Sequence, residues 1–68
     1  MKEEVKVMLV VVYVMSKRDK YHMLTKEISV GELSSFNITP LLPSNFQIME
    51  MAIGEMFIEK FKKLYNIT

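Results

Sequence analysis

The sequence predicts a small α+β domain, a ββα unit with a β-hairpin, an irregular strap and one long C-terminal helix. Residues 5–15 form an apolar run rich in β-branched valine, which favours a strand. A polar turn of hairpin length follows at residues 16–20. Apolar residues then recur at helical spacing across residues 45–65. With 68 residues in all, the chain has room for a single domain, residues 1–68.

The composition indicates a folded chain with a core that needs additional support. The chain is 50% hydrophobic, but a domain of this size buries only about 60% of its unfolded surface. Since it has no cysteine and a single histidine, no disulfide, no metal site and no other cofactor is expected. A partner chain is the remaining means of stabilisation. We therefore expect a C2 homodimer, the commonest oligomer.

Charge and hydropathy narrow the class of protein. A net charge of +1, from 9 basic and 8 acidic residues, favours neither a nucleic-acid binder nor an acidic mimic of DNA. The apolar run at residues 7–15 is shorter than the about 20 residues that a membrane-spanning helix needs. Two acids precede it and no small-residue cleavage site follows, unlike in a secretory signal. We expect a cytoplasmic protein without a membrane partner, in the host cytoplasm if it is viral.

The first strand is expected to be buried on both faces. Apolar side chains occupy the odd and the even positions alike from Val7 to Met15. A short buried helix is the alternative, which the valine content disfavours. The second strand, residues 21–30, is mixed on both faces. Because a two-stranded hairpin is marginal in water, pairing of the first strand with its symmetry mate would cover its open edge and build the dimer.

An irregular strap is expected between the hairpin and the helix. Residues 29–32, S-V-G-E, fit a capping box and predict one helical turn over residues 33–36. Two prolines then keep residues 37–43 extended. This segment is apolar, so it either lies over the core or forms a contact surface. Its apolar members are Ile38, Leu41 and Leu42.

A long helix is expected to close the chain. Residues 44–47, S-N-F-Q, fit a second capping box and open a helix over residues 45–65. Its apolar arc is wide enough to pack against its own sheet and against the same helix of a second chain, with Gly54 allowing close approach. The sequence leaves open whether strands or helices join the dimer. The expected core stripe comprises Phe46, Met49, Ile53, Phe57 and Leu64.

The sequence does not predict an enzyme. His22 is the sole histidine, and the residues around it do not suggest a catalytic triad. The acidic residues of the 45–65 segment are spaced as solvated side chains on a helix. Gly31 and Gly54 are the two glycines, so there is no glycine-rich loop to hold a phosphate. We therefore expect His22 to be an ordinary strand residue.

The hairpin turn offers one alternative function. It carries three basic residues, and an aromatic residue follows them directly. Such a tip could contact phosphate groups of a nucleic acid, and a dimer would present it twice. A solvated turn that keeps an apolar hairpin soluble explains the same residues. The residues concerned are Lys17, Arg18, Lys20 and Tyr21.

One short motif resembles a known family. Residues 33–36 read L-S-S-F, after a strand, a charged turn and a strand that contains tyrosine. In this order and in its L-S-x-F motif, the chain is similar to the very small dimeric inhibitors of uracil-DNA glycosylase made by some phages of Gram-positive bacteria. The resemblance covers residues 21–36 and the general layout. It implies that Phe36 plugs an apolar pocket on the glycosylase, from a dimer that occupies the DNA-binding cleft. That family places an acid after the phenylalanine, where this chain has Asn37.

The function expected is therefore inhibition of a host enzyme by protein–protein contact, with uracil-DNA glycosylase as the favoured partner. The alternative is a dimeric regulator that binds nucleic acid through the basic hairpin tip. Salt dependence separates the two, because phosphate contacts weaken steeply with salt and an apolar plug does not. The expected partner-binding residues are Phe36, Glu32, Asn37, Leu33 and Ile38.

Overall fold

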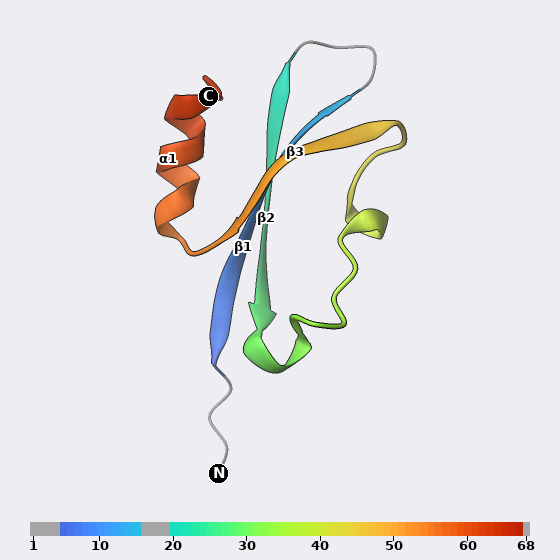
Figure 1. Cartoon of the computed structure of the whole chain (residues 1–68), viewed down its shortest axis with the longest axis vertical. Helices are drawn as coiled ribbons and strands as arrows, with labels where there is room; N and C mark the ends of the chain where they lie inside the picture. Colours follow the sequence, from blue (N-terminus) through green and yellow to red (C-terminus); the bar gives the residue numbers. More distant parts are fainter. Residues whose placement is uncertain (1–4, 16–19, 68) are drawn as a thin grey trace.

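The structure is a computed structural model that describes residues 5–15 and 20–67 (Figure 1). It contains a three-stranded antiparallel sheet and a C-terminal helix, which confirms the α+β class. Two short 3-10 helices lie between the second and third strands. In chain order the elements are β1 (Lys6–Met15), β2 (Tyr21–Ser29), η1 (Val30–Glu32), η2 (Thr39–Leu41), β3 (Phe46–Ile53) and α1 (Met56–Leu64).

The sheet has the order β2-β1-β3, so that β1 is its central strand. The predicted hairpin is confirmed: β1 pairs antiparallel with β2, and Val11 lies opposite Leu24. On its other side β1 pairs antiparallel with β3, where Val11 lies opposite Met51. Sequence reasoning expected two strands, and the third comes from a segment that was expected to be helical.

The prediction that the first strand is buried on both faces is confirmed. Val10, Val11 and Val12 have no exposed surface, although successive side chains of a strand point to opposite faces. Each face of β1 therefore has its own cover. The odd-numbered positions face the strap and the even-numbered positions face α1.

The strap, residues 30–45, covers one face of the sheet. Its buried residue Ile38 joins Leu9, Val11 and Ile28 in one apolar cluster. Figure 1 shows this segment running along the sheet on the side away from α1. The interpretation of residues 37–43 as a strap over the core is thus confirmed. Its predicted extended conformation is wrong at Thr39–Leu41, which forms 3-10 helix η2, because proline is tolerated in the first turn of a helix. Leu24, Leu33, Phe36 and Leu42 pack around the cluster as partly buried residues.

Helix α1 covers the opposite face. Phe61 is the one helical residue that is almost completely buried, and it contacts the cluster formed with Val10 and Val12. The layers are therefore strap, sheet and helix, stacked about β1 (Figure 1). No helix within residues 5–15 and 20–67 has the length and apolar character needed to cross a membrane. The other residues packed against this cluster are Met8, Tyr21, Met23, Ala52, Phe57, Ile58, Tyr65 and Ile67.

The prediction of one helix over residues 45–65 is wrong. Phe46–Ile53 forms β3, and the helix is limited to Met56–Leu64. Asn45 has φ 60° and Gly54 has φ 137°, so both ends of β3 have backbone conformations that interrupt a right-handed helix. The second capping box is instead part of the turn into β3. Gly54 separates strand from helix, and it is not part of α1.

The apolar spacing of this segment fits two periods, which explains the error. Phe46, Met49 and Ile53 match helical spacing, whereas Phe46 and Ile48 alternate with the polar Gln47 as in a strand. The alternation shifts at Met49, which is an extra residue in β3 because Tyr13 pairs with Ile48 while Val12 pairs with Glu50. A β-bulge of this kind disguises strand periodicity.

The expected helix stripe and the first capping box also need correction. Leu64 was placed in the core stripe but is 65% exposed. Phe61 and Tyr65 face the sheet instead. The helical turn predicted over residues 33–36 does not form there. A 3-10 helix lies instead at Val30–Glu32, and the Ser29 side chain makes no capping hydrogen bond to it.

The proposed route to a dimer through β1 is not open. Residues 9–15 of β1 pair with β3, and residues 6–14 pair with β2. Both edges of β1 are thus occupied within one chain over most of its length. Pairing of β1 with its symmetry mate would require β3 to leave the sheet, so the structure does not support this contact.

Candidate functional site

The predicted anchor Phe36 lies in the strap and packs against the buried cluster that includes Val11 and Ile38. Its side chain is half-buried, and that of Ile38 is 9% exposed. Much of the apolar surface that would enter a pocket on a partner therefore already contacts the sheet. Leu33, Phe36 and Ile38 lie together in the structure, but they pack against the sheet and thereby attach the strap to it.

The two polar residues predicted beside Phe36 are both exposed. The Asn37 side-chain oxygen accepts a hydrogen bond from the Thr39 backbone N–H at 3.1 Å. This contact forms a local turn of the type that asparagine favours. The Glu32 backbone carbonyl accepts hydrogen bonds from the backbone N–H and the hydroxyl of Ser35. The exposed carboxylate of Glu32 remains compatible with a partner contact.

A different set of residues forms the main exposed apolar surface. Leu9 lies opposite Ile53 and Val11 opposite Met51, so these β3 side chains are on the strap face of the sheet. The strap covers Leu9 and Val11 but leaves the β3 side chains 37–49% exposed. We call this set the β3 apolar surface. It consists of Ile48, Met51 and Ile53, whose partners in β1 are Tyr13, Val11 and Leu9, together with the adjacent bulge residue Met49.

Strand β3 also has a free edge. The Gly54 N–H donates to the Met8 carbonyl at 2.8 Å, which fixes the alternation of the ladder between β1 and β3. Since bonded and non-bonded pairs alternate in antiparallel strands, the N–H and C=O of Met51 and Ile53 point away from β1. The strand order places no other strand there within the described part of the chain.

The two edges of the sheet differ in character. At the outer strand β2, Lys26 and Glu27 are exposed, and Glu27 lies 3.7 Å from the Lys6 ammonium group. Charged side chains of this kind discourage pairing with another chain. Strand β3 has one charged residue, Glu50. The β3 edge is therefore the sheet edge that is less protected against association.

Glu50 is held on the helix face, away from the β3 apolar surface. The Tyr65 hydroxyl donates a hydrogen bond to the Glu50 carboxylate at 2.6 Å. This bond is the main reason that the pKa of Tyr65 lies above its usual value of 10.0, with desolvation and the charge of Glu50 contributing further. The phenol therefore stays protonated at neutral pH, and it ties β3 to the end of α1.

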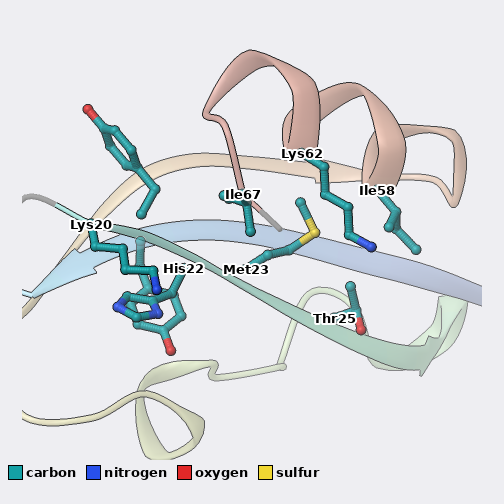
Figure 2. A pocket seen from close by; sticks show the side chains of 9 residues that line it. Lys20, His22, Met23, Thr25, Ile58, Lys62 and Ile67 are labelled. Atoms are coloured by element: carbon teal, nitrogen blue, oxygen red, sulfur yellow. The ribbon is translucent and has the colours of Figure 1, made fainter.

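A hollow of about 440 Å³ follows β2, with Met23 and residues of α1 lining it on one face of the sheet and Tyr13 and His22 on the other (Figure 2). Lys20 and His22 lie next to each other at one end, while Lys62 and Ile58 extend from α1 above Met23. Its lining includes two lysines and no carboxylate, although Lys62 is 3.9 Å from Glu59 outside the lining. The lining residues are Tyr13, Lys20, Tyr21, His22, Met23, Thr25, Ile58, Lys62 and Ile67.

The hollow contains half of the predicted basic tip. Lys20 and Tyr21 line it, whereas Lys17 and Arg18 lie outside the described residues. Lys62 comes from α1, so the sequence could not show that it lines the same hollow as Lys20. The structure thus forms a basic surface from two elements that are far apart in the chain.

His22 lies in a setting that suits a structural role. Its ring stacks on Tyr13 with centroids 5.4 Å apart. Its buried Nε2 atom has no hydrogen-bond partner within residues 5–15 and 20–67. Over the same residues, no cluster of histidine, cysteine and acidic side chains could hold a metal ion.

The fold and these surfaces define a small α+β protein with a three-stranded antiparallel sheet, one covering helix and an apolar sheet edge. Comparison with protein-family models, curated proteins and solved structures finds no match to the chain. The resemblance to the glycosylase inhibitors therefore depends on the L-S-S-F motif. The layout adds nothing to it, because a strap and β3 precede the helix here.

Proposed function

We propose that this chain acts by protein–protein contact, as a binding module that inhibits a host enzyme. The observation that carries the proposal is the β3 apolar surface, whose four side chains are 37–49% exposed next to one another on one strand. Contiguous apolar patches on soluble proteins commonly mark interaction sites. Two of the four are methionines, whose flexible side chains adapt to a partner.

The strap and the β3 apolar surface can enter one interface, because both lie on the same face of the sheet. Val11 illustrates this: Met51 lies opposite it in the sheet, and Ile38 of the strap packs in the same cluster. Leu41 of the strap is also 46% exposed. A partner on this face would contact the β3 side chains directly. Phe36 would then contribute its exposed part and fix the strap in place.

Uracil-DNA glycosylase is the partner that the L-S-S-F motif favours. Micromolar wild-type protein is expected to slow uracil excision by the purified glycosylase. Met51→Asp should weaken this inhibition at least about tenfold, the effect of losing about 1.4 kcal/mol at a central contact. Phe36→Ala should weaken it as well, with circular dichroism confirming that the variant is folded.

The matched control is Leu64→Asp, which places the same charge on an exposed apolar residue of α1. It should inhibit as the wild type does. Absence of inhibition by micromolar wild type would exclude the glycosylase as the partner. Equal inhibition by wild type and Met51→Asp would exclude the β3 apolar surface as the contact.

Binding of nucleic acid is the second candidate function. The observation that favours it is that Lys20 and Lys62 line the same hollow as Tyr21. Two ammonium groups can contact successive phosphates of a single strand. A tyrosine beside them can stack on a base.

A fluorescently labelled single-stranded oligonucleotide tests this candidate by anisotropy. If both lysines contact phosphate, raising the salt from about 50 to about 200 mM should weaken binding about sevenfold. The double variant Lys20→Gln and Lys62→Gln should remove most of this salt dependence. Lys26→Gln and Lys63→Gln, on exposed residues outside the hollow, are the matched control. Binding that does not respond to salt would contradict this function.

A further inference from the structure

We infer that a second copy of this chain docks on the free edge of β3, antiparallel to it, so that the sheet continues through both copies. In the register that we propose, Met51 lies opposite Ile53 of the second copy and Ala52 lies on the two-fold axis. The inference concerns the backbone of β3, and it goes beyond the proposed contact of its side chains with a host enzyme.

The first step is the direction of the backbone groups. Ala52 pairs with Val10, two residues along the ladder from the bond between the Gly54 N–H and the Met8 carbonyl. Ala52 therefore bonds to β1, because bonded pairs recur at every second residue. Met51 and Ile53, on either side of it, direct their N–H and C=O groups outward.

The second step is the match between two such edges. In an antiparallel pair, two opposed residues whose backbone N–H and C=O groups point toward each other exchange two hydrogen bonds. Met51 opposite Ile53 of the second copy, and the symmetric pair, would satisfy every outward group of both residues. Ala52 would face its own mate at the position where side chains approach most closely, which suits a methyl group.

The β-bulge selects this register over its neighbour. A two-fold axis at Met51 would place Ile53 opposite Met49 of the second copy, and Met49 is the extra residue of the bulge. Ladder pairing is disrupted at such a residue. With the axis at Ala52, Glu50 lies opposite Gly54 of the second copy, which has no side chain to obstruct it.

A second copy fits this edge better than an extended segment of another protein. Its β3 is already a strand, so pairing does not incur the entropy cost of ordering a flexible peptide. The charge of Glu50 does not oppose it, since Tyr65 holds that carboxylate on the helix face. At the opposite edge of the sheet, Lys26 and Glu27 are exposed and disfavour the equivalent contact.

The paired sheet would also enlarge the proposed contact surface. A two-fold axis perpendicular to the sheet keeps the same face of both copies on one side. The two β3 apolar surfaces would then lie next to each other, between the two straps. Dimer formation through the edge and binding of a partner on this face are therefore compatible.

Cysteine cross-linking tests the register directly, because the chain has no cysteine of its own. Ala52→Cys should form a disulfide-linked dimer under mild oxidation, since opposed residues of a non-bonded pair lie within disulfide range. Met51→Cys is the matched control. It is the more exposed position, but it would face Ile53 of the second copy and should cross-link at least about tenfold more slowly.

Light scattering over a concentration series tests the dimer without a new bond. Wild type should reach twice its 8.0 kDa mass at high micromolar concentration. Met51→Pro should stay at 8.0 kDa, because it removes an outward N–H that β1 does not use, and proline is tolerated on edge strands. Met51→Ala keeps that N–H and should still dimerise, while its inhibition of the glycosylase weakens.

These outcomes separate the two proposals. An 8.0 kDa wild type at all concentrations, or a Met51→Cys variant that cross-links faster than Ala52→Cys, would overturn the paired edge. A dimer that fails to inhibit the glycosylase would instead overturn the proposed function. Circular dichroism of each variant shows whether a variant that does not dimerise is still folded. The cross-linking of Ala52→Cys is a test that does not depend on the proline variant.

Discussion

Replacing Phe61 with alanine is expected to destabilise the fold by about 3–5 kcal/mol. Phe61 is 3% exposed, and it packs α1 onto the sheet between Val10 and Val12. Its ring also contacts the ring of Phe57, with centroids 5.3 Å apart. Because small domains have a total stability of only about 5 kcal/mol, the variant should be largely unfolded at 37 °C. Urea denaturation followed by circular dichroism measures the change.

The control for this prediction is Leu64→Ala, one turn further along α1. Leu64 is 65% exposed, so its truncation should change the free energy of unfolding by no more than about 0.5 kcal/mol. If the two variants lost equal stability, α1 would not be attached to the sheet through Phe61.

A carboxylate in the middle of β1 should prevent folding altogether. In Val11→Asp the new side chain would replace a residue with no exposed surface, inside the cluster formed with Leu9 and Ile28. Leaving a charge unpaired in such a site costs several kcal/mol or more. We expect a circular dichroism spectrum without strand signal at pH 7, and a partial recovery at low pH when the carboxyl group is protonated.

Val5→Asp is the matched control, because it introduces the same charge next to the same strand. Val5 is 65% exposed, so the free energy of unfolding of this variant should lie within about 0.5 kcal/mol of that of the wild type. A folded Val11→Asp variant at pH 7 would contradict the burial of β1 between the strap and the helix.

Local sequence patterns were sufficient to predict two of the three strands of the sheet and the cover of one face. The valine-rich run at residues 5–15 could be hidden only between two layers, and this follows from composition alone. The polar turn made β2 its neighbour. The prolines excluded a long helix from residues 37–43, although Thr39–Leu41 forms a 3-10 turn and is not extended as predicted. The apolar residues of this segment had to pack against a surface. Each of these statements depends on residues that are close in sequence.

Strand β3 could not be predicted in the same way. Residues 46–53 suit an amphipathic helix and a bulged strand about equally, and the local pattern cannot choose between them. The free edge of β1 decides the choice, because its backbone groups need partners. The helix error also placed Gly54 at one of the two dimer contacts considered, a helix–helix contact, and it concealed the β3 apolar surface.

The candidate site shows the same division. The L-S-S-F motif predicts that Phe36 is an anchor for a partner. In the structure, the apolar side chain of Phe36 packs in large part against the sheet and holds the strap there. The sequence predicts a basic surface at the hairpin tip that includes Lys20. In the structure, Lys20 shares its hollow with a second lysine, Lys62, which comes from α1. Contacts between such distant positions arise only from tertiary packing.

The sequence by itself determined that β1 is a buried strand, that β2 follows it in a hairpin, and that the apolar strap must lie against a surface. Local period, turn residues and proline geometry are enough for these features. Only the tertiary structure decided that residues 46–53 complete the sheet as β3. The edge of β1 that pairs with β3 lies far away in the chain, from 31 residues between Met15 and Phe46 to 44 residues between Leu9 and Ile53. Such long-range hydrogen bonding leaves no local signature. That choice exposes the β3 apolar surface and its edge, on which both proposals depend.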